Sequence, residues 1–223
     1  MNLKNIFEFL IDLRFNNNRP WFKESVQRFQ STKTDFEQFI DTVIPKIRKI
    51  DNSINDIKAK DCIYRIYRDV RFSKNKEPYK TSYGAFVSKD GKKSHHAGYY
   101  IHFEPDASLI CCGVYQPNPT LLKAIRTEIY NNPNEYKNIL ATIKKRNYFT
   151  HFYGDTLKSA PRGFSKNFPD IDLLKNKHFV IAYKIDNEFW FEENLIESIE
   201  KVIKAQKKYA DFINRIIEKM EGK

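Results

Sequence analysis

The chain of 223 residues is 41% hydrophobic and 15% aromatic, and 30% of its residues are charged. This aromatic content excludes a disordered or purely electrostatic scaffold. The length suits one large domain or two small ones, and we expect a single domain over residues 1–223. The net charge of +11 makes nucleic acid, anionic membranes or phosphorylated small molecules the partners to consider.

Cysteine content and hydropathy indicate the compartment. The three cysteines are Cys62, Cys111 and Cys112, an odd number with two of them adjacent, which is not the framework of a secreted disulfide protein. No segment approaches the roughly 20 apolar residues that span a bilayer. We therefore expect a soluble cytoplasmic protein without a membrane partner, whose oligomeric state the sequence does not define.

The N-terminal quarter has the apolar spacing of helices. Residues 6–13 predict a first short helix. Pro20 suits the first turn of a second helix, with Asn18 or Arg19 near its cap. Apolar residues at spacings of three and four continue to about Ile50, which predicts one long helix or two collinear ones.

The rest of the chain alternates strand and helix patterns in blocks. The predicted strands are residues 62–67, 82–89, 97–104, 109–115 and 178–185. Helices are predicted from Asn118, beyond the break at residues 131–133, and between Glu188 and Met220. Because the strands mostly follow one another directly, the expected class is α+β, an antiparallel sheet of hairpins covered by helices from both termini.

A basic segment separates the first two predicted strands. Residues 68–81 read RDVRFSKNKEPYKT, and residues 60–93 carry ten Lys or Arg against four Asp or Glu. Arg forks suit bidentate recognition of phosphate or carboxylate, Lys supplies point charges, and Tyr and Thr donate hydroxyl hydrogen bonds. The candidate ligand-binding residues are Arg65, Arg68, Arg71, Ser73, Lys76, Tyr79, Lys80 and Thr81.

The same segment carries a family resemblance. The run fits the pattern RDxRFSxxKxPYKT at every position and resembles the signature of domain-of-unknown-function family 2461, a group of uncharacterised bacterial and fungal proteins. NNNRPWF near the N-terminus, the hairpin GYYIHFEP to GVYQP, LLKAIR and LKSAPRGF support the resemblance. It implies one compact α+β domain and no established activity, cofactor or catalytic residue.

Four interpretations of the basic segment stay open. The leading one is a site for a phosphate-bearing ligand, a nucleotide or a nucleic acid. The second is an enzyme for a phosphorylated or carboxylated substrate, with Asp69 as general base or orienter of Arg71, and Tyr79 or a Lys as acid. The third is a module that binds an acidic protein, and the fourth is a solvated surface loop.

The histidines do not form a metal pattern. His102 and Glu104 share one face of a predicted strand, and His95 and His96 lie in a turn, but the sequence shows no HExxH, no paired CxxC and no third ligand. No GxSxG, P-loop or GxGxxG motif occurs. We therefore predict neither a metal nor a cofactor, and whether the chain is an enzyme stays open.

Overall fold

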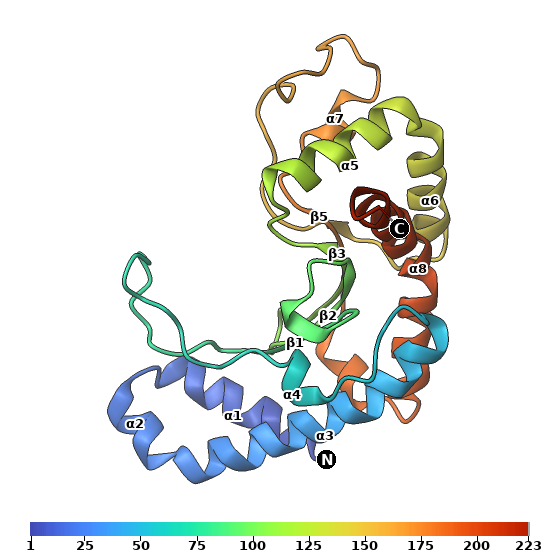
Figure 1. The fold of residues 1–223 in the computed structure, drawn as a ribbon. Helices are drawn as coiled ribbons and strands as arrows, with labels where there is room; N and C mark the ends of the chain where they lie inside the picture. The colour runs from blue at the N-terminus through green and yellow to red at the C-terminus, as the bar shows by residue number, and fades with distance from the viewer. Residues whose placement is uncertain (223) are drawn as a thin grey trace. The chain divides into compact units, whose positions relative to one another are not determined.

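The computed structural model describes residues 1–222, as helices and one sheet (Figure 1). The α-helices are α1 (Leu3–Phe15), α2 (Arg19–Glu24), α3 (Val26–Ile50), α4 (Ala59–Cys62), α5 (Pro119–Asn131), α6 (Pro133–Lys145), α7 (Ile171–Leu174) and α8 (Leu195–Met220). The strands are β1 (Tyr83–Val87), β2 (Gly98–Phe103), β3 (Leu109–Val114), β4 (His151–Phe152) and β5 (Phe179–Lys184), and the 3-10 helices are η1 (Gly91–Lys93) and η2 (Asn187–Phe191). The sheet order is β1-β2-β3-β5-β4, so the predicted α+β class is confirmed.

The described chain forms two compact units, each assembled from three stretches. Unit 1 comprises residues 1–93, 100–110 and 184–200. Unit 2 comprises residues 94–99 and 111–183, and the chain from residue 201 onward. Strands β2 and β3 each contribute residues to both units. The expectation of a single domain stays a prediction.

Unit 1 is built on the apolar stripe of α3. Phe36 of this helix has its ring 5.1 Å from Tyr83 of β1 and 6.5 Å from Phe103 of β2. The ring of Trp190, from η2, lies 4.6 Å from Phe103. All four side chains are buried, and each aromatic side chain of this kind removes roughly 150–250 Å² from water, so this cluster is a main source of the unit's stability.

Unit 2 has its own buried aromatic cluster. Tyr136 of α6 lies against Tyr209 and Phe212 of α8, with ring centroids 5.9 and 5.3 Å apart. The two tyrosine hydroxyls are 3.2 Å apart and hydrogen bond to each other, so neither buried oxygen is left unsatisfied.

The helix starts follow the predicted caps. The side chain of Asn18 accepts a hydrogen bond from Trp21 N, and that of Asn118 accepts one from Leu121 N. Ser25 separates α2 from α3, so the segment from Arg19 to Ile50 forms two helices, the second of the two predicted alternatives.

The predicted strand over residues 62–67 is wrong. Cys62 ends α4 instead, a helical turn whose start is held by Asp41, which accepts from Ala59 N at 2.8 Å, and by Asp61, which accepts from Lys58 N at 3.0 Å. Residues 63–67 make only isolated bridges, Ile63 to Ala85 and Tyr67 to Tyr79.

The last helix begins at Leu195, later than the predicted outer bound at Glu188. Residues 187–191 form η2 rather than the start of α8, and the buried indole of Trp190 donates a hydrogen bond to Ser108 Oγ at 2.9 Å. The sequence pattern does not predict the short elements α4, α7 and β4. Such short elements depend on contacts with neighbouring segments more than on their own periodicity.

Candidate functional site

The basic segment forms a paired arm in unit 1. We call residues 65–81 the basic arm; it is the teal loop at the left of Figure 1, and its tip stands clear of α1 and α2. Its two sides are joined by hydrogen bonds from Lys80 N to Ile66 O at 2.8 Å and from Arg68 N to Pro78 O at 2.9 Å. These bonds give the base of the arm a defined backbone, unlike an unpaired solvated loop.

Tyr79 anchors the arm to the N-terminal helices. Its ring is 6% exposed and stacks on Phe22 of α2, with centroids 3.8 Å apart and planes 11° apart. The side chain of Asn17 donates to Tyr79 O at 3.0 Å and accepts from Tyr79 N at 3.1 Å. Burial, followed by the nearby Tyr67, raises the pKa of the Tyr79 phenol. Tyr79 therefore positions the arm and keeps its proton at neutral pH.

Carboxylates on the arm hold two of its arginines. Arg71 forms a bidentate pair with Asp69, from Nε to Oδ1 at 3.0 Å and from Nη2 to Oδ2 at 2.7 Å. Hydrogen bonds from Arg71 lower the pKa of Asp69. Glu77 Oε2 lies 3.5 Å from Arg68 Nη1. Of the two roles considered for Asp69, this geometry favours the orienter of Arg71, since both of its carboxylate oxygens are engaged.

Cations gather at the base of the arm. The Lys80 ammonium is half-buried, and its Nζ lies 5.7 Å from the ring centroid of Tyr64. Burial lowers the pKa of Lys80 first, and the charges of Arg65 and Arg68 lower it further. Like charges that approach one another beside a partly buried ammonium repel, and a bound anion would relieve that repulsion.

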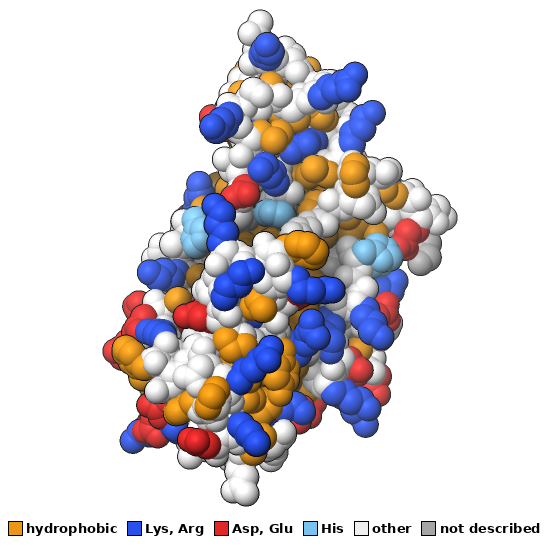
Figure 2. All heavy atoms as spheres, turned by 90° about the vertical axis from the view of Figure 1, so that its left-hand side faces the viewer, with side chains coloured by type: hydrophobic (Ala, Val, Ile, Leu, Met, Phe, Trp, Pro, Cys, Tyr) orange, Lys and Arg blue, Asp and Glu red, His pale blue; other side chains and the backbone are white. Residues whose placement is uncertain are grey.

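The tip of the arm combines charge with an exposed aromatic ring. Phe72 is 96% exposed, and the guanidinium carbon of Arg71 lies 5.9 Å from its ring centroid. Ser73 is half-buried next to it, and Lys76 Nζ donates to Val70 O at 3.1 Å. The face drawn in Figure 2 carries many Lys and Arg side chains with hydrophobic side chains between them.

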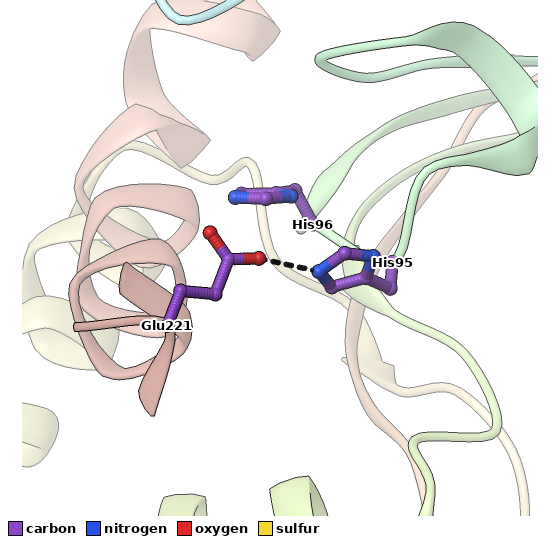
Figure 3. A group of neighbouring side chains, drawn as sticks. All are labelled: His95, His96 and Glu221. Carbon is purple, nitrogen blue, oxygen red and sulfur yellow. Dashed lines mark hydrogen bonds and ion pairs between the residues drawn. The ribbon is translucent and has the colours of Figure 1, made fainter. Parts of the chain in front are cut away.

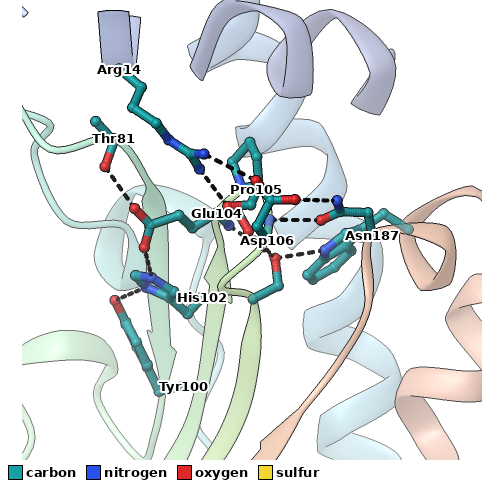
Figure 4. Close-up of polar contacts among 10 residues, drawn as sticks. Arg14, Thr81, Tyr100, His102, Glu104, Pro105, Asp106 and Asn187 are labelled. Carbon is teal, nitrogen blue, oxygen red and sulfur yellow. Dashed lines mark hydrogen bonds and ion pairs between the residues drawn. The ribbon is translucent and has the colours of Figure 1, made fainter. Parts of the chain in front are cut away.

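A chain of hydrogen bonds lies where the arm enters β1 (Figure 4). Thr81 Oγ1 donates to Glu104 Oε1 at 2.6 Å, and His102 Nε2 lies 2.8 Å from Glu104 Oε2. His102 Nδ1 is 3.1 Å from the hydroxyl of Tyr100. Tyr100 and His102 alternate along β2, and Glu104 follows directly after the strand, so the three side chains meet as the predicted alternation indicates. We call these three residues the Tyr-His-Glu chain.

Glu104 is the hydrogen-bond acceptor at one end of this chain. Burial raises the pKa of Glu104, but hydrogen bonds from His102 and Thr81, together with the charges of His102 and Arg14, outweigh it and hold the pKa below its usual range. The ionised carboxylate accepts from both partners, so His102 carries a proton on Nε2, and its Nδ1 shares a hydrogen bond with the Tyr100 hydroxyl. This arrangement suits general acid–base chemistry at Tyr100 or His102.

The turn after β2 is tied to α1 by Arg14. Its guanidinium donates to Pro105 O and to Asp106 Oδ2, the latter at 3.0 Å, and Asn187 hydrogen bonds to the same Asp106 (Figure 4). These contacts hold the turn that follows Glu104.

The comparison with protein families decides the classification. A family model described as conserved hypothetical protein (DUF2461) matches residues 5–212. The chain belongs to this family. No curated protein and no solved structure matches the chain.

Two sequence segments used for the resemblance to DUF2461 meet in this member of the family. NNNRPWF supplies Asn17 and Phe22, and the basic segment supplies Tyr79, which both of them contact. The sequence predicts Tyr79 as a ligand-binding residue or an acid. It does not predict Asn17 or Phe72 as site residues, and it presents Glu104 only beside His102, as a possible metal pair that lacks a third ligand. The alternation Tyr-x-His-x-Glu over residues 100–104 is the sequence signal for Glu104.

The structure of this DUF2461 protein adds two general observations. Within residues 1–222, no helix is long and apolar enough to cross a membrane. In unit 1, a cavity of about 760 Å³ is lined by residues 1–4 and 190–197, Thr42 and Lys46, and none of these belongs to the basic arm.

Proposed function

We propose that this protein binds single-stranded nucleic acid through the basic arm. The supporting observation is Phe72, an almost fully exposed aromatic ring beside Arg71, at the tip of a backbone-paired arm that carries several cations. Aromatic rings stack on unpaired bases, and Lys and Arg side chains bind the phosphates. The arm therefore offers contacts to both the bases and the backbone of a single strand.

A polymer suits the arm better than a small phosphate does. Arg71 and Arg68 are held by Asp69 and Glu77 on the arm itself, so they do not converge on one point as an enclosed phosphate site requires. The remaining cations form two groups along the arm, with Lys74 and Lys76 in the segment beyond Phe72 and with Arg65 and Lys80 at the base. Spread charges match the repeating phosphates of a strand.

The test is fluorescence anisotropy with a labelled oligothymidine over a range of salt concentrations. Each phosphate contact on a single strand contributes about 0.7 to the slope of log affinity against log salt. The variant Lys74→Ala/Lys76→Ala removes two cations and is therefore expected to reduce the magnitude of this slope by about 1.4. Phe72→Ala is expected to weaken binding by about 1–3 kcal/mol. The matched control, Lys4→Ala/Lys33→Ala, removes the same charge from exposed faces of α1 and α3.

Two outcomes would contradict this proposal. The first is an equal loss of affinity in the control variant and in the arm variants, which would mean that only the net charge of the protein attracts the oligonucleotide. A poly-glutamate peptide bound as tightly as the oligonucleotide, with no loss in Phe72→Ala, would point instead to an acidic protein partner.

The Tyr-His-Glu chain supports a second candidate function. It places an imidazole, oriented by a carboxylate, in the same unit as the half-buried Lys80, as an acid–base enzyme for a phosphorylated or carboxylated substrate would require. A screen of phosphomonoesters and carboxylic esters tests this function. Turnover that is lost in His102→Asn and kept in His151→Asn would support it, and turnover equal in both variants would refute it.

A further inference from the structure

Three metal-ligating side chains meet in unit 2 (Figure 3). His95 and His96 lie between η1 and β2, and Glu221 follows the last turn of α8. One ligand atom from each lies within 4.8 Å of the other two. His95 Nε2 and Glu221 Oε1 are 2.7 Å apart, across 126 residues of sequence.

The backbone around these side chains is held in place from both sides. The Asn214 side chain accepts from Ala97 N at 2.8 Å and donates to Ala97 O at 3.2 Å, which clasps the histidine segment to α8. Glu221 lies seven residues after Asn214, just past the end of α8, and its backbone N donates to Ile217 O at 3.0 Å. On the other side, Ser94 Oγ accepts from His96 N at 3.2 Å.

The third side chain of the set, His96, is buried close to the other two. His96 is 5% exposed, yet its ring lies 4.8 Å from that of His95 and faces the same carboxylate in Figure 3. Each of the three groups offers one ligand atom to the same small region, which is the arrangement that a metal cation needs.

We propose that His95, His96 and Glu221 bind a divalent transition-metal ion, with Zn²⁺ as the ion to test. Two imidazole nitrogens and one carboxylate oxygen form a set found in open zinc and iron sites, which leaves a position for water or a ligand. Bonds of about 2.0–2.1 Å place tetrahedral ligand atoms about 3.3 Å apart. His95, whose side chain is 67% exposed, has room to rotate and close the remaining gap.

Metal binding is tested on the full chain without an affinity tag, after treatment with a chelator. Calorimetry with Zn²⁺ is expected to give one site per chain, and Co²⁺ to give the visible absorption of a tetrahedral site. Glu221→Gln keeps a hydrogen-bond acceptor for His95 but removes the charge, and is expected to weaken Zn²⁺ binding by more than about 100-fold. The control is His151→Ala, which removes an exposed histidine elsewhere in unit 2 and is expected to leave binding unchanged.

The outcomes separate a metal site from a hydrogen-bonded clasp. Wild-type protein without a stoichiometric Zn²⁺ site, or Glu221→Gln with wild-type affinity, would overturn the proposal. Equal losses in His151→Ala and Glu221→Gln would overturn it as well, because binding would then be general. His96→Asn is a further ligand variant, and circular dichroism checks its folding. Should it unfold, Glu221→Gln, which changes a residue beyond the end of α8, still decides the question.

Discussion

The contact between Asn17 and Tyr79 gives a direct test of how the basic arm is held. Asn17→Ala removes both hydrogen bonds to the Tyr79 backbone and leaves the stack of Tyr79 on Phe22 in place. Each hydrogen bond contributes about 0.5–1.5 kcal/mol net, so we expect a loss of about 2 kcal/mol for the pair. At 1.4 kcal/mol for each factor of ten, the opened arm becomes about 30-fold more populated.

Hydrogen exchange measures this opening at one amide. Lys80 N donates to Ile66 O across the base of the arm, so its exchange is expected to become faster in Asn17→Ala by that factor. Trypsin cleavage after Lys74 or Lys76 is expected to become faster in parallel. Asn75→Ala is the matched control, because the Asn75 side chain pairs with Glu77 at the tip and does not reach the base.

The reasoning would be refuted by either of two results. An equal rate of amide hydrogen exchange at Lys80 in wild type and Asn17→Ala would mean that the stack of Tyr79 on Phe22 alone holds the arm. Equal acceleration in Asn17→Ala and Asn75→Ala would mean that the arm opens from its tip, and the double hydrogen bond would then have no special role.

Three further predictions concern the fold and its titration. Gly113→Ala would place Cβ 2.0 Å from Phe179 O at a residue with φ of +136°, so urea denaturation should show a loss of about 3–5 kcal/mol, and a loss below 1 kcal/mol would contradict this packing. Because the folded pKa of Glu104 is lowered, its ionised form stabilises the fold above the unfolded pKa of about 4.3, and this stability is lost as pH falls through the folded pKa. The stability difference between wild type and Glu104→Gln should therefore shrink between about pH 6 and pH 3, and a constant difference would exclude the linkage. Burial raises the pKa of Cys62 and of Cys111 to about 12, so a thiol reagent at neutral pH should label them only after denaturant is added, and labelling of the native protein would show that they are accessible.

Local signals in the sequence determined most of the secondary structure. The stripe of α3, the caps at Asn18 and Asn118, and the alternation of β2 follow from spacing and side-chain chemistry within a few residues. The same signals predict that Tyr100, His102 and Glu104 lie on one side of the chain, where hydrogen bonds link them. These features are predictable because each depends on neighbours close in the chain.

Tertiary contacts decided what these local signals left open. Residues 62–67 have a partly alternating pattern, but Asp41 starts a helix before them and only isolated bridges follow. Tyr79 resembles a site residue by composition, and its burial against Phe22 makes it an anchor. Glu221 reaches His95 across 126 residues, a distance over which no spacing rule operates. Periodicity reports which side of an element is apolar, whereas the partner of a side chain depends on packing between segments remote in sequence.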